Sequence, residues 1–214
     1  MSNAPRRLTA ELLGSLLLTG AVIGSGIAAE RMSGGNGAIA LLANTGATAA
    51  MLFVLITALA PISGAHFNPA VTLVSALKRE IGFGMASAYV FAQVLGCVLG
   101  AMLAHAMFSL PLISASTHER SGPAQMLSEG VATFALVFAI VATSRARPSA
   151  VAASVALVIA AGYWWTASTS FGNPAITIAR SMSDTFAGVR PEDAPAFIVS
   201  QIVGALIAWM CCAM

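Results

Sequence analysis

Two copies of the tripeptide Asn-Pro-Ala, at Asn68-Pro69-Ala70 and Asn173-Pro174-Ala175, are the residues whose types and spacing most strongly suggest chemistry. An Asn followed by Pro is a typical helix start, because the Asn side chain caps free backbone N–H groups and Pro fits the first helical position. Each start also carries an amide donor and the positive end of a helix dipole. Two such starts at membrane depth are costly unless they line a polar cavity. The pattern therefore predicts a pore suited to small polar solutes.

The composition of the chain is that of a membrane protein. Of its 214 residues, 58% are hydrophobic and 8% are charged, whereas soluble domains carry about 25% charged residues. A net charge of +2, without a basic stripe, argues against nucleic acid as a partner. No set of His, Cys or carboxylate residues has metal-ligand spacing, and no nucleophile arrangement is visible. The sequence therefore predicts a protein that is not an enzyme and holds no metal.

Six apolar stretches are long enough to cross a bilayer core of about 30 Å at about 1.5 Å per residue. Two shorter apolar runs, 68–77 and 174–182, cannot cross it, and we predict that both are re-entrant half-helices. The predicted spans are 8–29, 38–60, 83–109, 124–144, 150–167 and 194–214.

The two halves of the chain repeat a common pattern. Gln93 and Gln201 follow the two Asn-Pro-Ala strings by 25 and 28 residues (93 − 68 and 201 − 173). Each half, about 8–109 and about 124–214, contains three spans and one half-helix. Because three is odd, the halves must have opposite orientations, and the half-helices then meet at the midplane. The predicted fold is an all-α membrane protein with an inverted repeat, forming one channel-like domain over 1–214.

The chain resembles the aquaporin (major intrinsic protein) family in several motifs at once. They are the string Ser63-Gly64-Ala65-His66-Phe67-Asn68-Pro69-Ala70-Val71-Thr72, the second Asn-Pro-Ala, the two Glu residues inside spans and the Ala-Gln of the third span. The resemblance covers the whole chain. It implies the aquaporin fold, a homotetramer with one pore per subunit, a small-molecule permeant and no cofactor.

Glu11 and Glu129 lie inside predicted spans, where an ionisable side chain suggests a functional site such as a proton relay. A re-entrant loop, however, exposes backbone N–H groups that a carboxylate can accept. We therefore predict that both carboxylates support the loops, and that Gln93 and Gln201 act in the same way. His66 is expected at the cytoplasmic mouth, where a pH-sensitive gate is the alternative to a purely structural role.

One departure from the family concerns the narrowest constriction, which four positions line in family members. Three residues after the second Asn, where the family has an Arg, this chain has Ile176. The family's other offsets fall on Thr48, Ser170 and Ala161, with Gly162 as the alternative to Ala161. Small residues and a missing Arg predict a wide, uncharged and partly apolar filter that admits solutes larger than water.

Arg180 lies four residues after Ile176, and Asn44 lies four residues before Thr48. On helices these positions share a face, one turn further toward the predicted outer mouth. We hypothesise that Asn44 and Arg180 form a second polar ring there, which would attract anions or oxyacids. The alternative is an ion pair between Arg180 and Asp184 that points away from the pore.

Residues 173–186 also resemble a bacterial subgroup of the family that is associated with arsenic-resistance operons. That resemblance implies arsenite or methylated arsenicals as solutes. Our prediction is a passive channel for polyols, metalloid hydroxides and water. Two alternatives stay open: a water-selective aquaporin, and a secondary transporter, which would need a coupling site such as midplane carboxylates.

The basic residues favour one topology. By the positive-inside rule the side with more Lys and Arg faces the cytoplasm, which places both termini inside and suggests a bacterial inner membrane. The inner set is Arg6, Arg7, Lys78, Arg79, Arg145 and Arg147, and the outer set is Arg31, Arg120, Arg180 and Arg190.

Overall fold

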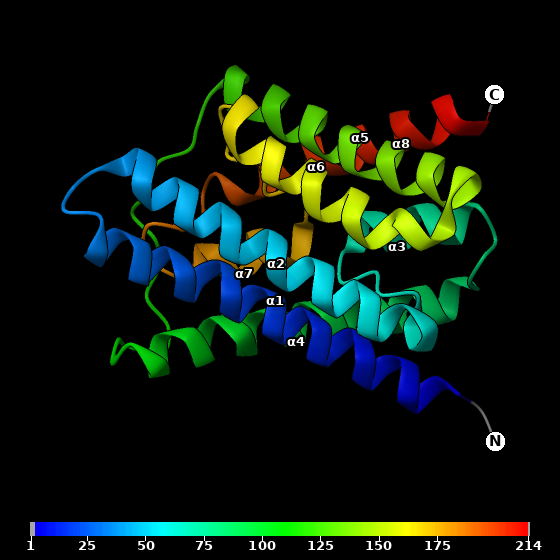
Figure 1. Ribbon diagram of the computed structural model, residues 1–214, viewed down its shortest axis with the longest axis horizontal. Helices are drawn as coiled ribbons and strands as arrows, with labels where there is room; N and C mark the ends of the chain where they lie inside the picture. Colours follow the sequence, from blue (N-terminus) through cyan, green and yellow to red (C-terminus); the bar gives the residue numbers. More distant parts are fainter. Residues whose placement is uncertain (1–2, 214) are drawn as a thin grey trace.

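The computed structural model describes residues 3–213, and its helices surround two short ones near the middle (Figure 1). No strand occurs within that range, so the predicted all-α class is confirmed. Met214, the last residue of the sixth predicted span, lies outside the described residues. The helices are α1 (Ala4–Met32), α2 (Gly37–Ser63), α3 (Pro69–Leu77), α4 (Phe83–Met107), α5 (Pro123–Ala146), the 3₁₀ turn η1 (Pro148–Ala150), α6 (Val151–Trp165), α7 (Pro174–Ser181) and α8 (Ala194–Ala213).

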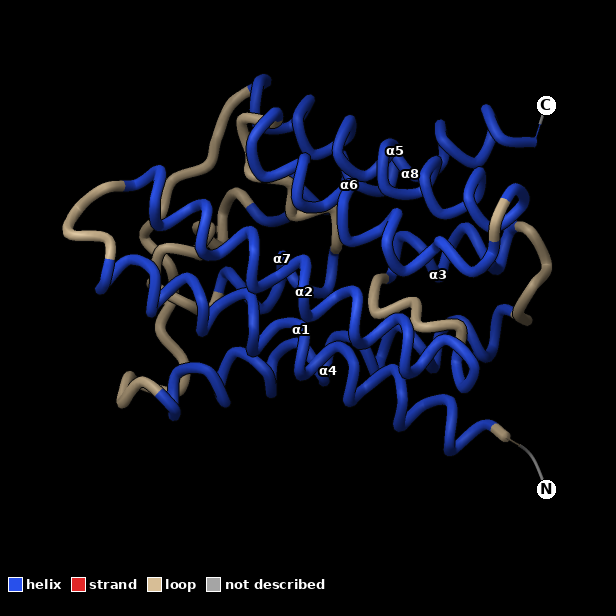
Figure 2. Tube along the Cα trace, viewed as in Figure 1, coloured by secondary structure: helices blue, strands red, loops and turns tan. Residues whose placement is uncertain are grey.

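Both ends of the chain lie at the same end of the molecule (Figure 1), which we call the terminal end. The opposite end, called the loop end, carries the turn 33–36 and the long connection 108–122, which are drawn as tan loops in Figure 2. The segment before α3 enters the interior from the terminal end, and the segment before α7 enters from the loop end. The two half-helices therefore approach each other from opposite sides.

The long helices pack in two equivalent sets. α1 lies along α4, α5 lies along α8, and α2 and α6 join the two sets. Each half-helix contacts the long helices of both sets, since α3 packs on α4 and α8 while α7 packs on α8 and α4. This is the inverted repeat that the sequence predicted, and it brings the half-helices together at the centre.

Close approach between long helices depends on glycine. A Cβ atom built on Gly204 of α8 would overlap the backbone of Gly130 on α5, and one built on Gly96 of α4 would overlap that of Leu12 on α1. Small residues at such contacts let backbones pack closely, which is how helices associate where lipid removes the hydrophobic driving force.

The outer surface suits a bilayer. Within residues 3–213, six helical segments of at least 18 residues are long and apolar enough to cross one: α1, α2, α4, α5, η1 with α6, and α8. Large apolar side chains on these helices face outward, including Phe91, Leu127 and Leu157, which are 71%, 70% and 68% exposed. In water such exposure would be unfavourable, whereas in lipid it is the expected arrangement.

Candidate functional site

The first residues of the half-helices meet at the centre of the molecule. Asn68 and Asn173 have extended backbones, and their side-chain oxygens accept from Ala70 N at 2.9 Å and Ala175 N at 3.0 Å. Proline follows each Asn at the first helical position, where no N–H is required. The helix starts predicted from the two Asn-Pro-Ala strings are therefore present.

Each Asn amide also donates to the loop of the other half. Asn68 Nδ2 donates to the carbonyl oxygen of Gly172 at 2.7 Å, and Asn173 Nδ2 donates to that of Phe67 at 2.8 Å. An amide nitrogen carries two hydrogens, so one donor on each Asn remains for a solute. The reciprocal bonds lock the two half-helix starts against each other.

The loops before the half-helices share an unusual backbone. The residues four, three and one positions before each Asn all have positive φ: Gly64, Ala65 and Phe67 in the first loop, and Thr169, Ser170 and Gly172 in the second. A non-glycine residue with positive φ costs of order 1–3 kcal/mol unless its surroundings hold it there. Two equivalent strained loops therefore need equivalent support.

Glu11 supplies that support for the first loop. Its Oε1 accepts from Ser63 Oγ at 2.6 Å and His66 N at 3.0 Å. Its Oε2 accepts from Phe67 N at 2.8 Å and Gln93 Nε2 at 2.8 Å. The side chain is fully buried, and four donors compensate its charge.

Glu129 makes the matching contacts in the second loop. Its Oε1 accepts from Ser168 Oγ at 2.5 Å and Phe171 N at 2.9 Å. Its Oε2 accepts from Gly172 N at 3.0 Å and Gln201 Nε2 at 2.6 Å. Each carboxylate therefore accepts four hydrogen bonds, two from backbone N–H groups of its loop, one from a Ser hydroxyl and one from a Gln on a long helix.

A cavity of about 260 Å³ passes between the two halves, and Asn68 and Asn173 both line it. One wall is apolar and includes Leu18, Val22, Leu52 and Ile56 from α1 and α2, together with Leu136, Ile140, Val155 and Ile159 from α5 and α6. The remaining wall is formed by the two re-entrant loops and the half-helices. The cavity is therefore amphipathic along its length.

At the loop end, the cavity is bordered by Thr48, Tyr163, Ser170 and Ile176. The hydroxyl groups of Thr48 and Tyr163 lie 3.2 Å apart and join α2 to α6 by a hydrogen bond. Three of these four positions were predicted from the sequence. Tyr163 was not, and its ring occupies the side of the cavity where a small residue was expected.

The prediction for α6 was wrong in its register. Ala161 is exposed on the outer face of α6, and Gly162 is buried against the side chain of Ser170 without lining the cavity. Ile159 and Tyr163, which line it, lie four residues apart on one helix face, whereas Ala161 between them points to the opposite side. Counting back from Asn173 crosses the 166–173 loop, and loop length is the least fixed part of such a count.

The predicted ring of Asn44 and Arg180 is only half present. Asn44 is buried against α1, where Nδ2 donates to Val22 O and Ser25 Oγ, both at 2.8 Å, and it does not line the cavity. Arg180 does line the cavity. Its Nε donates to the carbonyl of Ala187, and no ion pair with Asp184 occurs among residues 3–213. The alternative ion pair is therefore also wrong.

His66 lines the cavity on the terminal side of the two Asn residues. Its Nδ1 lies 3.1 Å from Thr72 Oγ1, and its ring packs edge-on against Tyr89 with centroids 5.3 Å apart. Glu80 borders the same end and is paired with Lys78 at 2.5 Å. These contacts fix the imidazole at the position predicted for a cytoplasmic mouth.

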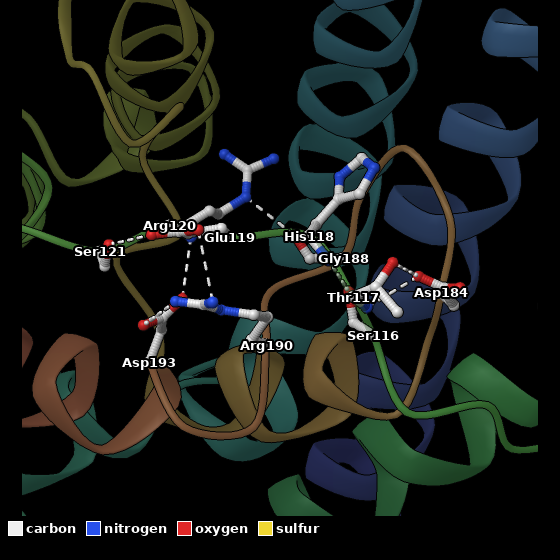
Figure 3. Close-up of polar contacts among 10 residues, drawn as sticks. All are labelled: Ser116, Thr117, His118, Glu119, Arg120, Ser121, Asp184, Gly188, Arg190 and Asp193. Carbon is white, nitrogen blue, oxygen red and sulfur yellow. Dashed lines mark hydrogen bonds and ion pairs between the residues drawn. The ribbon is translucent and has the colours of Figure 1, made fainter.

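The 108–122 connection is tied to the segment after α7 by polar contacts (Figure 3). The backbone N–H and hydroxyl of Thr117 donate to Asp184 Oδ1 at 2.8 and 2.9 Å, and these hydrogen bonds lower the pKa of the Asp184 carboxyl below its ordinary value. Arg120 N donates to Asp193 Oδ2 at 2.9 Å, and Arg120 Nε donates to Gly188 O at 2.8 Å. Sequence reasoning did not find this role of Arg120, since nothing near it in the chain marks its contacts with the segment after α7.

Comparison with known proteins agrees with this geometry. Residues 1–159 match the sequence profile of the family described as Major intrinsic protein. Aquaglyceroporin AqpS of Rhizobium meliloti (strain 1021) is 53% identical over 203 residues, which cover 95% of this chain and 87% of AqpS. The chain belongs to the major intrinsic protein family. As a member of it, the protein is a multi-pass membrane protein and a passive channel for small solutes, and it is not an enzyme.

More distant major intrinsic proteins share the same architecture. Aquaporin TIP4-4 of Zea mays is 36% identical over 146 residues, covering 64% of this chain and 57% of the maize protein. The X-ray structure of the aquaglyceroporin from Plasmodium falciparum superposes with a TM-score of 0.77 at 18% identity and covers 97% of this chain and 94% of that one. At that identity the likeness concerns the fold alone, which is the aquaporin fold.

Proposed function

We propose that this channel conducts small uncharged hydroxylated solutes, such as glycerol and other polyols, neutral metalloid hydroxides including arsenite and methylated arsenicals, and water. The proposal rests on one observation above all: a continuous amphipathic cavity passes both Asn68 and Asn173, and Ile176 stands at the position of the family's filter Arg. In the proposed path, solutes move past the two Asn amides in single file.

The amphipathic lining supports polyols in particular. A polyol presents hydroxyl groups along one edge and C–H groups along the other. Here the loops and Asn amides would bind the hydroxyl edge, while the aliphatic side chains of α1, α2, α5 and α6 face the C–H edge. Neutral arsenite, with three hydroxyl groups, offers hydrogen-bonding groups similar to those of glycerol. Relative to water, such solutes gain contacts with the apolar wall.

The half-helix starts support the exclusion of protons. Two positive dipole ends meet at the centre, and each Asn donates a hydrogen to the oxygen of a passing molecule. A water held through its oxygen at that point cannot relay a proton along a continuous chain, and a cation is repelled. We assign this role to Asn68 and Asn173, and the support of their loops to Glu11, Glu129, Gln93 and Gln201.

We propose the filter of the channel at Thr48, Tyr163, Ser170 and Ile176. Tyr163 and Thr48 present hydroxyl groups, whereas Ile176 presents an apolar side chain where an Arg would narrow the hole and add a charge. A different contact favours an alternative function, because the hydrogen bond between Thr48 and Tyr163 narrows the cavity at the loop end. A water-selective channel is therefore the second candidate function.

The proposed setting is a homotetramer with one pore per subunit in a bacterial inner membrane. Both termini and the His66 side of the cavity would face the cytoplasm, as the distribution of Lys and Arg favours. The chain from 1 to 214 would form a single channel domain.

Stopped-flow light scattering on proteoliposomes tests the proposed solutes directly. Gradients of glycerol, arsenite and an impermeant osmolyte are run in parallel against protein-free liposomes. We expect glycerol and arsenite to equilibrate several-fold faster through the protein than through lipid alone. Fast water flow without glycerol or arsenite flow would replace the proposal with the water-selective candidate.

A further inference from the structure

The guanidinium group of Arg180 is buried at the loop end of the cavity with little compensation for its charge. The residue is 3% exposed, and Nε donates to the carbonyl of Ala187. Its two terminal nitrogens make no hydrogen bond within residues 3–213, although the side chain lines the cavity. These nitrogens are absent from the buried polar atoms that lack a partner, so their N–H groups face the cavity and can donate to an acceptor inside it.

A second arginine increases the positive charge at the same place. The central guanidinium carbon of Arg180 lies 3.2 Å from the ring centroid of Phe171, and that of Arg120 lies 5.2 Å from it. Arg120 Nη1 donates to the carbonyl of Ser168 at 3.3 Å, and Figure 3 shows its Nε directed at Gly188. Both acceptors of Arg120 are thus neutral carbonyl groups. The two cations share one aromatic ring, which lines the cavity.

Carboxylates offset the charge of this pair only in part within the residues that the structure describes. Neither side chain forms an ion pair there. Glu129, the buried acid on this side of the channel, offsets part of the positive charge of both arginines, but its oxygens accept four hydrogen bonds from neutral donors and pair with neither guanidinium. The one acid that lines the cavity within residues 3–213 is Glu80, which lies at the terminal end and is paired with Lys78.

We infer that Arg180 forms a binding site for one small, singly charged oxyanion at the loop end of the channel, with Arg120 adding to the local positive potential. A planar guanidinium presents parallel N–H donors that match two oxygens of such an anion. The site lies one helical turn beyond Ile176, so an anion held there stands in the path of every solute. This inference rests on the proposed function, since the first experiment that tests it measures glycerol flow through the cavity.

The test compares glycerol flow in potassium nitrate and in potassium gluconate, each at the same concentration on both sides of the membrane. Nitrate is planar, has no neutral form near neutral pH and fits the guanidinium, whereas gluconate is a six-carbon chain and much larger than nitrate. The variants are Arg180→Gln, which removes the charge, and Arg180→Lys, which retains charge without the planar fork. Arg31→Gln is the control, since exposed Arg31 lies at the same end and donates to Phe108 O.

We expect nitrate near its dissociation constant to slow glycerol about twofold in the wild type, as half-occupancy of a blocking site requires. Arg31→Gln should respond like the wild type, Arg180→Lys less, and Arg180→Gln not at all. Equal slowing in the wild type and Arg180→Gln, or no slowing in the wild type, would overturn the inference.

A binding measurement in detergent makes the test independent of transport. The midpoint of thermal unfolding is measured in nitrate and in gluconate, and the nitrate-minus-gluconate difference should be more positive for the wild type than for Arg180→Gln. Equal differences in the two proteins would refute the site. If glycerol fails to pass while these differences remain unequal, the proposed solute is wrong and the anion site stands.

Discussion

Replacing Glu129 by Gln tests whether the buried carboxylates hold the re-entrant loops. The substitution keeps the shape of the side chain but turns one of its two oxygens into an NH₂ group. In the structure each oxygen of Glu129 accepts two hydrogen bonds, and two of the four donors are backbone N–H groups of the second loop. One pair of donors would then face another donor.

The expected loss follows from those contacts. A hydrogen bond to a charged group contributes about 1.5–3 kcal/mol, so losing two costs about 3–6 kcal/mol. That is a large part of the roughly 5–15 kcal/mol by which a domain is stable. On the scale of soluble domains of this size, at about 2–4 °C per kcal/mol, it corresponds to a fall of roughly 6–24 °C in the midpoint of thermal unfolding. Glycerol flow should fall as well, because the loop positions Asn173.

The assay is thermal unfolding in detergent, followed by glycerol flow in proteoliposomes at matched protein content. Glu11→Gln should show a loss of similar size, since Glu11 makes four equivalent bonds in the first loop. Glu119→Gln is the control: its side chain is 64% exposed, and its loss should stay within about 0.5 kcal/mol. If Glu129→Gln unfolds at the wild-type midpoint with undiminished flow, the loop-support account is refuted.

Three further predictions concern other parts of the molecule. Gly204→Ala should cost about 1–3 kcal/mol by forcing α8 away from α5, whereas Gly84→Ala, where a Cβ atom meets nothing within 4 Å, should be neutral or stabilising in the same unfolding assay. The pKa of the Asp184 carboxyl is lower in the folded protein than in the unfolded chain, where it is about 3.9. The hydrogen bonds from Thr117 should therefore contribute fully to stability above a pH of about 3.9, and this contribution should be lost as the pH falls through the pKa of the folded state. Asp184→Ala, which removes the acceptor oxygen, should therefore speed hydrogen exchange of the Thr117 amide at neutral pH, and unchanged exchange would contradict this. Tyr163→Ala should raise the flow of a four-carbon polyol relative to glycerol, while Tyr163→Phe should change this ratio little.

The sequence predicted the architecture well because its signals are local and repeated. Six apolar spans, two Asn-Pro helix starts and an odd number of spans per half define an inverted repeat without knowledge of any contact. The pairing of Glu11 and Glu129 with exposed loop N–H groups also followed from chemistry, since a buried carboxylate needs several donors.

The lumen was harder to predict because it depends on register and on long-range packing. Ala161 was chosen by counting across a loop, while the face shared by Val155, Ile159 and Tyr163, at intervals of four residues, was the better signal. Asn44 was expected in the lumen on the basis of helix geometry alone. Its amide instead donates to the Val22 carbonyl of α1, a contact that the sequence of its own helix does not predict.

The measurement that tests the central account most directly is glycerol flow through Ile176→Arg. The account places the solute path beside Ile176, so a guanidinium there should narrow the cavity and reduce glycerol flow to that of protein-free liposomes, with water flow reduced less. Ile113→Arg is the control, because Ile113 is 52% exposed in the 108–122 loop, and its glycerol flow should equal that of the wild type. If folded Ile176→Arg conducts glycerol as fast as the wild type, solutes do not pass through this cavity.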